Sequence, residues 1–369
     1  MTQTPSRRDR IKVLDLFAGA GGLSAGLHQA SERFDTVRAV EMDRAAAASY
    51  DATFGDERSY AGSIQDWLAE EDVPEVDVIV GGPPCQGFST LGKQDAEDTR
   101  NFLWREYAET IARAQPRYFV VENVAAFAKS SQFEDFTAAT APGGQLDSYG
   151  FEHRVLNAAD YGTPQARKRA VVIGWHRDLK FPGWPTPTHS ADGVRLPKHR
   201  TVADAIRGIP TTPDMDETFH GRKIEVGGLQ FTGAFSPREL HVSRTYSELS
   251  RRRFREIPAG GNRFDLPDSL LADCWRKHSS GSADVMGRLH WNRPSVTIRT
   301  EFFKPEKGRY LHPDPNIGRA ITHYEAAKLQ GFPDSHRFVG SRTAIAKQIG
   351  NAVPIPLGAA IGRQLASAL

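Results

Sequence analysis

One short motif places a reactive residue type directly after a strand-like segment. Cys85 lies in GGPPCQGFS, behind the apolar run VDVIV and next to Pro83 and Pro84. A thiol on a proline-stiffened turn can be exposed and deprotonated, and a thiolate is a strong nucleophile. A free cysteine is also often a small buried hydrophobic residue, and this motif alone supports both interpretations equally.

The other cysteine, Cys274 in LLADCWRKH, has no such turn around it, so we expect it to be a core residue. Two cysteines far apart in the sequence are too few for a disulfide framework or a cysteine-based zinc site. We therefore expect no metal, and a reducing, intracellular compartment.

Charged residues lie at the ends of two further strand-like runs. Glu122 lies near the end of YFVVEN, and a carboxylate bounded by apolar residues suits an acid that donates a proton near neutral pH. A salt-bridge partner or a charge at a helix N-terminus is the alternative for a solitary glutamate. Arg167 and Arg169 in QARKR alternate, so both are predicted to face one side of the strand entering AVVIGW. Such a pair can clamp an anionic group, while a solvated edge strand is the alternative.

A glycine-rich turn follows the first strand-like run. In DLFAGAGGLSAGL, Gly19, Gly21 and Gly22 separate a strand from a helix, so the backbone can approach a ligand closely. Glu41 ends the next strand about 20 residues later, where an acid typically holds ribose hydroxyls. The spacing departs from GxGxxG, so an adenosine ligand other than NAD has equal weight. A turn made only for helix–sheet packing is the alternative.

The elements that must position these motifs alternate between strand-like and helix-like runs. The strand candidates are rich in Val, Ile and Phe, which is typical of strands buried on both faces of a mostly parallel sheet. They are 13–17, 36–41, 76–82, 118–123 and 170–175. Helices are predicted from Leu23, over Arg44 to Tyr50, in THYEAAKLQGF and after Pro356. The pattern predicts an α/β fold with a doubly wound, mostly parallel sheet. EHRVLNA and RAVVIGW are too close for a crossover helix, so we expect an antiparallel pair.

The composition is that of a globular protein. Hydrophobic residues make up 39% of the 369 residues and charged residues 25%. No apolar run approaches the roughly 20 residues of a membrane helix, and the polar N-terminus does not indicate a signal peptide. A net charge of +2 neither requires nor excludes a nucleic-acid partner. After about Arg177, frequent prolines predict a second, loop-rich unit.

In this order the motifs resemble those of the DNA (cytosine-5) methyltransferase family, of the bacterial restriction-modification type. DLFAGAGGLS is similar to its first cofactor motif, PPCQGFS to its nucleophile motif, ENV to its glutamate motif and QARKR to its arginine motif. RPSVTIRT, from Arg293, and QIGNAVP, from Gln348, are similar to two later motifs. The similar segments span residues 13 to 354, and PPCQ followed by ENV is their most specific part.

The resemblance implies an S-adenosylmethionine-dependent methyltransferase fold with a smaller loop-rich target-recognition domain. The catalytic and cofactor-binding domain is expected at residues 10–180 plus 340–369, the target-recognition domain at 181–292, and a hinge and return segment at 293–339. The implied activity transfers a methyl group from S-adenosylmethionine to carbon 5 of cytosine in a specific double-stranded DNA sequence, leaving S-adenosylhomocysteine.

The resemblance also implies a role for each matched residue. Cys85 would be the covalent nucleophile on a flipped base, and Glu122 would bind the amine and N3 of that base. Arg167 would bind the base near its carbonyl, and Arg169 would support the nucleophile loop. The segment from Gln86 to about Arg100 would close over the base. The base that removes the carbon-5 proton is not identified by the sequence.

The remaining expected contacts fall into two groups. The cofactor-binding residues are expected to be Phe17, Ala18, Gly19, Gly21, Gly22, Leu23, Glu41, Met42, Ser63, Ile64, Pro83, Leu103, Asn351 and Val353. DNA contacts are expected from Gln86, Ser89, Arg251, Arg253 and Arg263, the last at the end of a flexible glycine loop that reaches bases. Ser63 stands where the family commonly has an acidic residue, and Asp66 follows three residues later.

The motifs leave three other interpretations open. A transfer-RNA cytosine methyltransferase would share the same motifs, but the long segment before RPSVTIRT favours duplex DNA. A catalytically silent DNA-binding relative has no reason to keep Cys85, Glu122 and Arg167 together. An NAD-dependent oxidoreductase rests on the glycine turn alone. We expect a monomer in the cytoplasm, associated with the nucleoid and not with a membrane, and a functional pairing with a restriction endonuclease.

Overall fold

A computed structural model describes residues 9–84, 103–213, 221–276 and 283–369. The chain divides into two compact units. The first comprises Met1–Tyr161, Lys168–Thr188 and Val353–Leu369, and the second comprises Gly162–Arg167 and His189–Ala352. This division differs from the expected domains, because residues 293–352 belong to the same unit as the proline-rich region.

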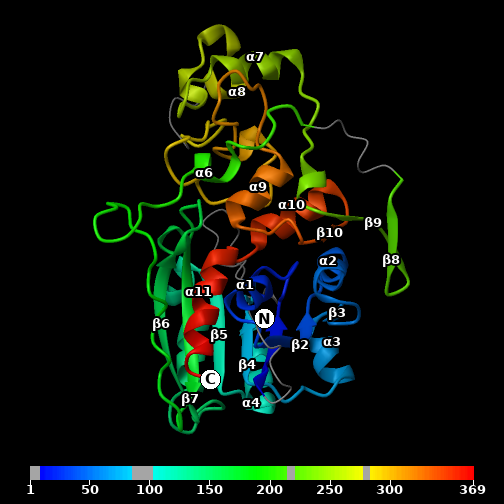
Figure 1. Ribbon diagram of the computed structural model, residues 1–369, viewed down its shortest axis with the longest axis vertical. Coiled ribbons are helices and arrows are strands. Elements are labelled where there is room, and N and C mark those ends of the chain that lie inside the picture. The colour runs from blue at the N-terminus through cyan, green and yellow to red at the C-terminus, as the bar shows by residue number, and fades with distance from the viewer. Residues whose placement is uncertain (1–8, 85–102, 214–220, 277–282) are drawn as a thin grey trace, which may run out of the picture. The chain divides into compact units, whose positions relative to one another are not determined.

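Seven strands of the first unit form one sheet in the order β3-β2-β1-β4-β5-β7-β6 (Figure 1). The strands β3, β2, β1, β4 and β5 pair in parallel, whereas β7 is antiparallel to both β5 and β6. The mostly parallel sheet and the antiparallel pair near its end are thus confirmed. The strand bounds are β1 Ile11–Leu16, β2 Phe34–Val40, β3 Ser59–Tyr60, β4 Val78–Gly81, β5 Tyr118–Val124, β6 Tyr149–Asn157 and β7 Lys168–His176.

Helices cover both faces of this sheet, as expected for a doubly wound fold. Alternate residues of each strand enter different cores: Val13 packs in the core with α1 and α11, and Leu14 in the core with α3, α4 and α5. The buried Trp67 and Tyr107 are large members of the second core. The helix bounds are α1 Gly22–Ala30, α2 Arg44–Phe54, α3 Ile64–Glu70, α4 Leu103–Ala114, α5 Ser131–Ala139 and α11 Ile355–Ala366.

Small residues let α1 lie directly against α11, the last helix of the chain. A Cβ atom added to Gly26 would stand 2.7 Å from backbone atoms of Gly358 and Ala359. Real Cβ atoms do not approach so closely, so glycine is required for this contact. The C-terminal helix therefore completes the core behind the strand that carries the glycine turn.

The second unit has less regular structure. Its sheet has the order β10-β9-β8 and is antiparallel throughout. Its strands are β8 Lys223–Val226, β9 Leu229–Phe235 and β10 Phe338–Val339, and its helices are α6 Val202–Ile206, α7 Glu248–Glu256, α8 Asp273–Arg276, α9 His323–Gln330 and α10 Arg342–Asn351. Turns and loops connect these short elements over most of the described residues of the unit. Among the described residues, no helix has the length and apolar character that crossing a membrane requires.

A buried ion pair organises the centre of the second unit. Two nitrogens of Arg319 each lie 2.8 Å from an oxygen of Glu325, and both side chains are buried. Glu325 also accepts a hydrogen bond from the backbone of Thr322, so a capping box starts α9 at the same place. Removing one partner of a buried pair leaves an uncompensated charge, which typically costs about 3–5 kcal/mol.

Candidate active site

The expected site residues of the first unit follow the carboxyl ends of five neighbouring parallel strands. Ligands of open α/β sheets bind at this edge, at the point where the chain changes direction along the sheet. That point lies between β1 and β4, whose pairing brings Leu16 opposite Gly81. In the spatial order of the sheet the residues at this edge are Ser63, Glu41, the glycine turn, Pro83 and Glu122.

The turn after β1 requires left-handed backbone conformations. Gly19 and Gly21 have φ values of 57° and 84°, and Phe17 adopts φ of 55° although it is not glycine. A non-glycine residue in this region is strained, and such residues gather at functional sites. A Cβ on Gly21 would strike the ring of Phe54, whereas a Cβ on Gly19 would meet nothing within 4 Å. The turn is thus packed at its helix end and open at Gly19.

Glu41 holds this turn through hydrogen bonds to two backbone groups. Its carboxylate accepts from the N–H of Gly19 at 2.8 Å and from the N–H of Asp43 at 2.7 Å. Burial raises the pKa of Glu41, and these hydrogen bonds oppose that rise. The next residue, Met42, is 69% exposed, so its side chain is not part of the hydrophobic core. An exposed apolar side chain therefore stands beside an oriented carboxylate.

Ser63 starts α3 and bonds to the acidic residue that follows it in the chain. Its hydroxyl accepts from the N–H of Asp66 at 3.0 Å and is 2.7 Å from a carboxylate oxygen of Asp66. Asp66 is exposed and Ser63 half-buried. A carboxylate thus lies one hydrogen bond from the position where the family commonly has an acid.

Glu122 and Arg169 form an ion pair between β5 and β7. The Nε of Arg169 lies 2.8 Å from Oε1 of Glu122, and both side chains are largely buried. The sequence offered a salt bridge as one interpretation of Glu122, and this ion pair is such a contact. The ion pair lies next to the end of β4, because a Cβ on Gly82 would stand 3.2 Å from Oε2 of Glu122.

Asn123 fixes the chain just before the nucleophile motif. Its side-chain amide donates a hydrogen bond of 3.0 Å to the carbonyl of Pro83, and this contact is buried. Pro84, the next residue, is the last one that the structure describes before Cys85. Cys85, Gln86, Ser89 and the expected lid from Gln86 to about Arg100 lie outside the described residues. Leu103 begins α4 and is half-buried against the core.

Arg167 lies in the second unit and binds backbone groups there. One guanidinium nitrogen donates to the carbonyls of Ile298 and Gly350, both at 2.9 Å. Another nitrogen is 3.5 Å from the carbonyl of Asn351. The side chain is only 3% exposed. Arg167 therefore joins the segments RPSVTIRT and QIGNAVP, the two later motifs of the sequence.

The other expected cofactor residues differ in accessibility. Phe17, Ala18 and Gly19 are half-buried, and Asn351 is exposed at the end of α10. The side chains of Leu23, Ile64, Pro83 and Val353 are buried, and Leu23 and Val353 belong to one core. A buried side chain can shape a pocket from behind but offers little surface to a ligand.

Two expectations about the second unit are wrong. Cys274 was predicted to be in the core but is exposed, because it lies on the four-residue α8, which buries no residue. Arg263 was predicted to project from a flexible glycine loop, but it is 7% exposed. Arg309 donates hydrogen bonds to the carbonyls of Gly260 and Gly261, so this loop is tied down.

The basic run before that loop is a helix with an exposed cationic face. On α7, Arg251, Arg252 and Arg255 are exposed, and Phe254 points into a small core. Arg253 is half-buried, donates to the carbonyl of Leu270 at 2.7 Å and packs on Trp275. The expected DNA contacts Arg251 and Arg253 therefore differ: one is on the open face and the other supports the fold.

Two residues of the site were missed by sequence reasoning. Asn123 belongs to the quoted ENV motif, but only an observed contact reveals that it holds Pro83. Asp15 is buried before the glycine turn and accepts a hydrogen bond of 2.6 Å from Ser24. Burial raises the pKa of Asp15 to about 7. Its position at the end of an apolar run was the available signal.

Known proteins resemble the chain over nearly its full length. The model of the family described as C-5 cytosine-specific DNA methylase matches residues 11–367. The chain is 32% identical to the type II methyltransferase M.XorII of Xanthomonas oryzae pv. oryzae, with 96% of the chain and 84% of that protein covered. It is 33% identical to the type II methyltransferase M1.HphI of Haemophilus parahaemolyticus, with 95% and 85% covered.

A solved structure agrees with these relatives. A protein described as a DNA modification methyltransferase encoded within an Escherichia coli prophage superimposes with a TM-score of 0.67. That match has 25% identity and covers 97% of this chain and 99% of the other. The chain therefore belongs to the C-5 cytosine-specific DNA methylase family, whose members are DNA (cytosine-5) methyltransferases.

Proposed function

We propose that this protein transfers a methyl group from S-adenosylmethionine to carbon 5 of cytosine in a specific double-stranded DNA sequence, with Cys85 as the covalent nucleophile on a flipped base. The observation that carries the proposal is the arrangement around Glu122. Asn123 fixes Pro83, and Gly82 lies against the Glu122 carboxylate. The chain therefore enters the nucleophile segment beside the glutamate that is to bind the base.

The residues at the sheet edge fit an adenosyl cofactor. The open side of Gly19 gives a ligand access to the backbone, and Glu41 is oriented beside it for ribose hydroxyls. The exposed Met42 offers an apolar surface for a purine ring, and Ser63 with Asp66 offers polar groups near it. S-adenosylmethionine bound there would supply an electrophilic methyl group and leave as S-adenosylhomocysteine.

The protein side chains must make carbon 5 of cytosine nucleophilic. The Cys85 thiolate would add to carbon 6, and the electron pair displaced from the ring double bond would make carbon 5 able to attack a methyl group. Transfer of the carbon-5 proton to a base, for which water would serve, then lets the sulfur leave and restores the thiolate. Glu122 would accept a hydrogen bond from the exocyclic amine and share a proton with N3, which stabilises the negative charge that develops on the ring.

The ion pair suggests an exchange of the two arginine roles expected from the sequence. Arg169 contacts Glu122 directly, so we assign to Arg169 the position beside the flipped base. Arg167 is surrounded by backbone carbonyls of Ile298 and Gly350, so we assign to it a positioning role within the second unit. Both arginines thus remain functional residues, but the contact with the base is assigned to Arg169 and the positioning role to Arg167.

DNA contacts are proposed for the exposed face of α7. The guanidinium groups of Arg251, Arg252 and Arg255 can bind phosphates, which sets affinity and salt dependence without selecting a sequence. The target base must leave the duplex stack to reach Cys85, at a cost of about a few kcal/mol. The relatives named type II methyltransferases also support a functional partnership with a restriction endonuclease.

Methylation of a plasmid tests the proposed function. The gene is expressed in a bacterial host that lacks cytosine methylation, and bisulfite sequencing maps 5-methylcytosine in the plasmid. We expect one repeated sequence to be modified, and we expect Cys85→Ala to lower modification by several orders of magnitude. Cys274→Ala is the matched control, because Cys274 is exposed on α8 and should be dispensable.

Two outcomes would contradict the proposal. One is normal methylation by Cys85→Ala, which would exclude covalent catalysis by that sulfur. The other is a purified protein that transfers label from the methyl donor to transfer RNA and not to duplex DNA.

A further inference from the structure

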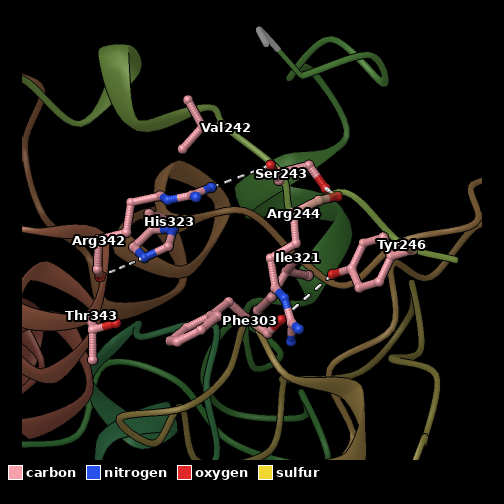
Figure 2. Close-up of a pocket in the computed structure, with 9 residues that line it drawn as sticks. All are labelled: Val242, Ser243, Arg244, Tyr246, Phe303, Ile321, His323, Arg342 and Thr343. Atoms are coloured by element: carbon pink, nitrogen blue, oxygen red, sulfur yellow. Dashed lines mark hydrogen bonds between the residues drawn. The ribbon is translucent and has the colours of Figure 1, made fainter. Parts of the chain in front are cut away.

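A cavity of about 140 Å³ lies within the second unit, and its lining includes none of the residues used in the proposed chemistry (Figure 2). One water molecule needs roughly 10–15 Å³ of such space, so the cavity has room for a ligand of many atoms. It is formed where the segment before α7 meets the first residues of α9 and α10. Its lining consists of Val242, Ser243, Arg244, Tyr246, Phe303, Ile321, His323, Arg342 and Thr343.

His323 gives this cavity a buried hydrogen-bond acceptor. Its Nε2 lies 2.9 Å from the carbonyl of Arg342, so Nε2 carries the proton and donates it. Burial lowers the pKa of His323 to about 4, so the ring is neutral near pH 7. Its Nδ1 is buried and has no hydrogen-bond partner in the part of the chain that the structure describes. A buried acceptor without a partner is costly, and a ligand N–H or O–H would satisfy it.

The charged groups of the cavity favour an anion. Arg244 and Arg342 both line it, and none of the nine lining residues is acidic. Thr343 is exposed in the first turn of α10, which contains no acidic residue. The N-terminus of a helix carries partial positive charge and favours anionic groups. The guanidinium of Arg244 is 3.9 Å from Glu306, but that pair is exposed and contributes little.

Aromatic side chains supply the apolar part of the wall. Phe303 stacks on His323 with a centroid distance of 5.5 Å and an interplanar angle of 22°. Tyr246 donates a hydrogen bond of 3.4 Å to the carbonyl of Phe303, which links the two sides of the cavity (Figure 2). Flat aromatic walls suit a planar ring, because bases stack on aromatic side chains.

We propose that this cavity binds a nucleotide. Its phosphate would lie against Arg244, Arg342 and the start of α10, and an N–H or O–H group of its base or sugar would donate to Nδ1 of His323. The same chemistry is offered by one nucleotide of a DNA strand and by a free nucleotide. The site uses none of the residues assigned to methyl transfer, so it goes beyond the proposed function.

The test places a negative charge at the mouth of the cavity. Thr343→Glu should repel a phosphate, yet it should not unfold the protein, because an acid in the first turn of a helix is favourable. Thr343→Gln is the neutral control of similar size. Arg244→Gln removes one cation, and Arg238→Gln is its control, since Arg238 is exposed and does not line the cavity.

Calorimetry of the full-length variants gives the readout with two probes. The four 2′-deoxynucleoside 5′-monophosphates test the free nucleotide, and a 12-nucleotide single-stranded DNA tests the strand. Thr343→Glu and Arg244→Gln should each weaken binding about tenfold, because a charge-assisted contact is lost, and both controls should bind as the wild type does. If the two variants bind the monophosphates more weakly than the wild type does, the ligand is a free nucleotide. If they bind only the single-stranded DNA more weakly, the ligand is a nucleotide of a DNA strand.

Equal affinities of Thr343→Glu and Thr343→Gln for both probes would overturn this inference. Duplex methylation is measured on the same samples. Methylation without any effect of these substitutions on binding leaves the proposed function in place and removes the nucleotide site. If nucleotide binding depends on Thr343 and Arg244 but the protein methylates no duplex, the nucleotide site stands and the proposed function fails.

Discussion

Arg167 and Arg169 stand two residues apart, but their guanidinium groups have different surroundings. Arg169 faces a carboxylate, Glu122, at 2.8 Å. Arg167 is buried among the carbonyls of Ile298 and Gly350, where it satisfies two acceptors. The alternation of QARKR correctly marked both arginines as special. It could not distinguish them, because their partners lie up to 184 positions away in the sequence.

Removal of Arg169 should mainly affect the rate of methyl transfer, whereas removal of Arg167 should mainly affect stability. Arg169→Ala should lower the single-turnover rate of methyl transfer by about 10²–10³-fold, as expected when a charge that stabilises the reaction is lost. Arg167→Ala should mainly lower the free energy of unfolding, by about 1–3 kcal/mol for each carbonyl left without a donor. Single-turnover rates and urea unfolding curves are measured for both variants. The control is Lys168→Ala, because Lys168 lies between the two arginines in the sequence and is exposed. Arg169→Ala also loses stability, because it leaves the buried Glu122 charge without its partner, so the rates decide between the roles. An equal loss of the single-turnover rate in both folded variants would contradict them.

At the scale of elements, the carboxyl edge of the sheet positions the site. The strands that carry the glycine turn, Glu41 and Glu122 were predictable, because their apolar runs end directly before polar or glycine residues. Their spatial order was not, since it depends on which parallel strands pair across the sheet. The buried Asp15 was also missed. Its partners Ser24 and, through it, Tyr50 come from α1 and α2, so β1, α1 and α2 meet at this carboxyl.

This junction should make stability depend on pH. The pKa of Asp15 is raised from 3.8 to about 7 by burial, so the folded protein keeps a proton that the unfolded chain releases above about pH 4. The stabilisation is complete below pH 3.8 and is lost as pH rises towards 7, by an amount of the order of 4 kcal/mol. Asp15→Asn stays neutral and can still accept from Ser24. Its advantage over the wild type should therefore grow between pH 5 and pH 8.

Urea unfolding at several pH values checks this prediction. The control is Asp56→Asn, which makes the same change at an exposed position, and its stability curve should run parallel to that of the wild type. A parallel curve for Asp15→Asn would mean that Asp15 is ionised in the folded protein over the whole range.

At the scale of the whole molecule, the motifs identified the family, while the second unit was the hardest part to predict. Its prolines and glycines correctly indicated loops, but loops are held by contacts that no local pattern reveals. Gly260 and Gly261 were predicted to form a flexible loop, yet Arg309 donates hydrogen bonds to their carbonyls. Cys274 read as a core residue, yet α8 is too short to bury it. Residues 293–352 join this unit through Arg167, Arg319 and their partners.

The covalent step is the central claim, and a DNA duplex with 5-fluorocytosine at the target position tests it most directly. Fluorine cannot leave carbon 5 as the proton does, so elimination is blocked and the enzyme stays attached to the base. With the methyl donor present, the wild type and Cys274→Ala should form a complex that survives denaturing electrophoresis, and Cys85→Ala should form none. An undiminished complex with Cys85→Ala, or none with a wild type that methylates the unmodified duplex, would contradict covalent catalysis by Cys85.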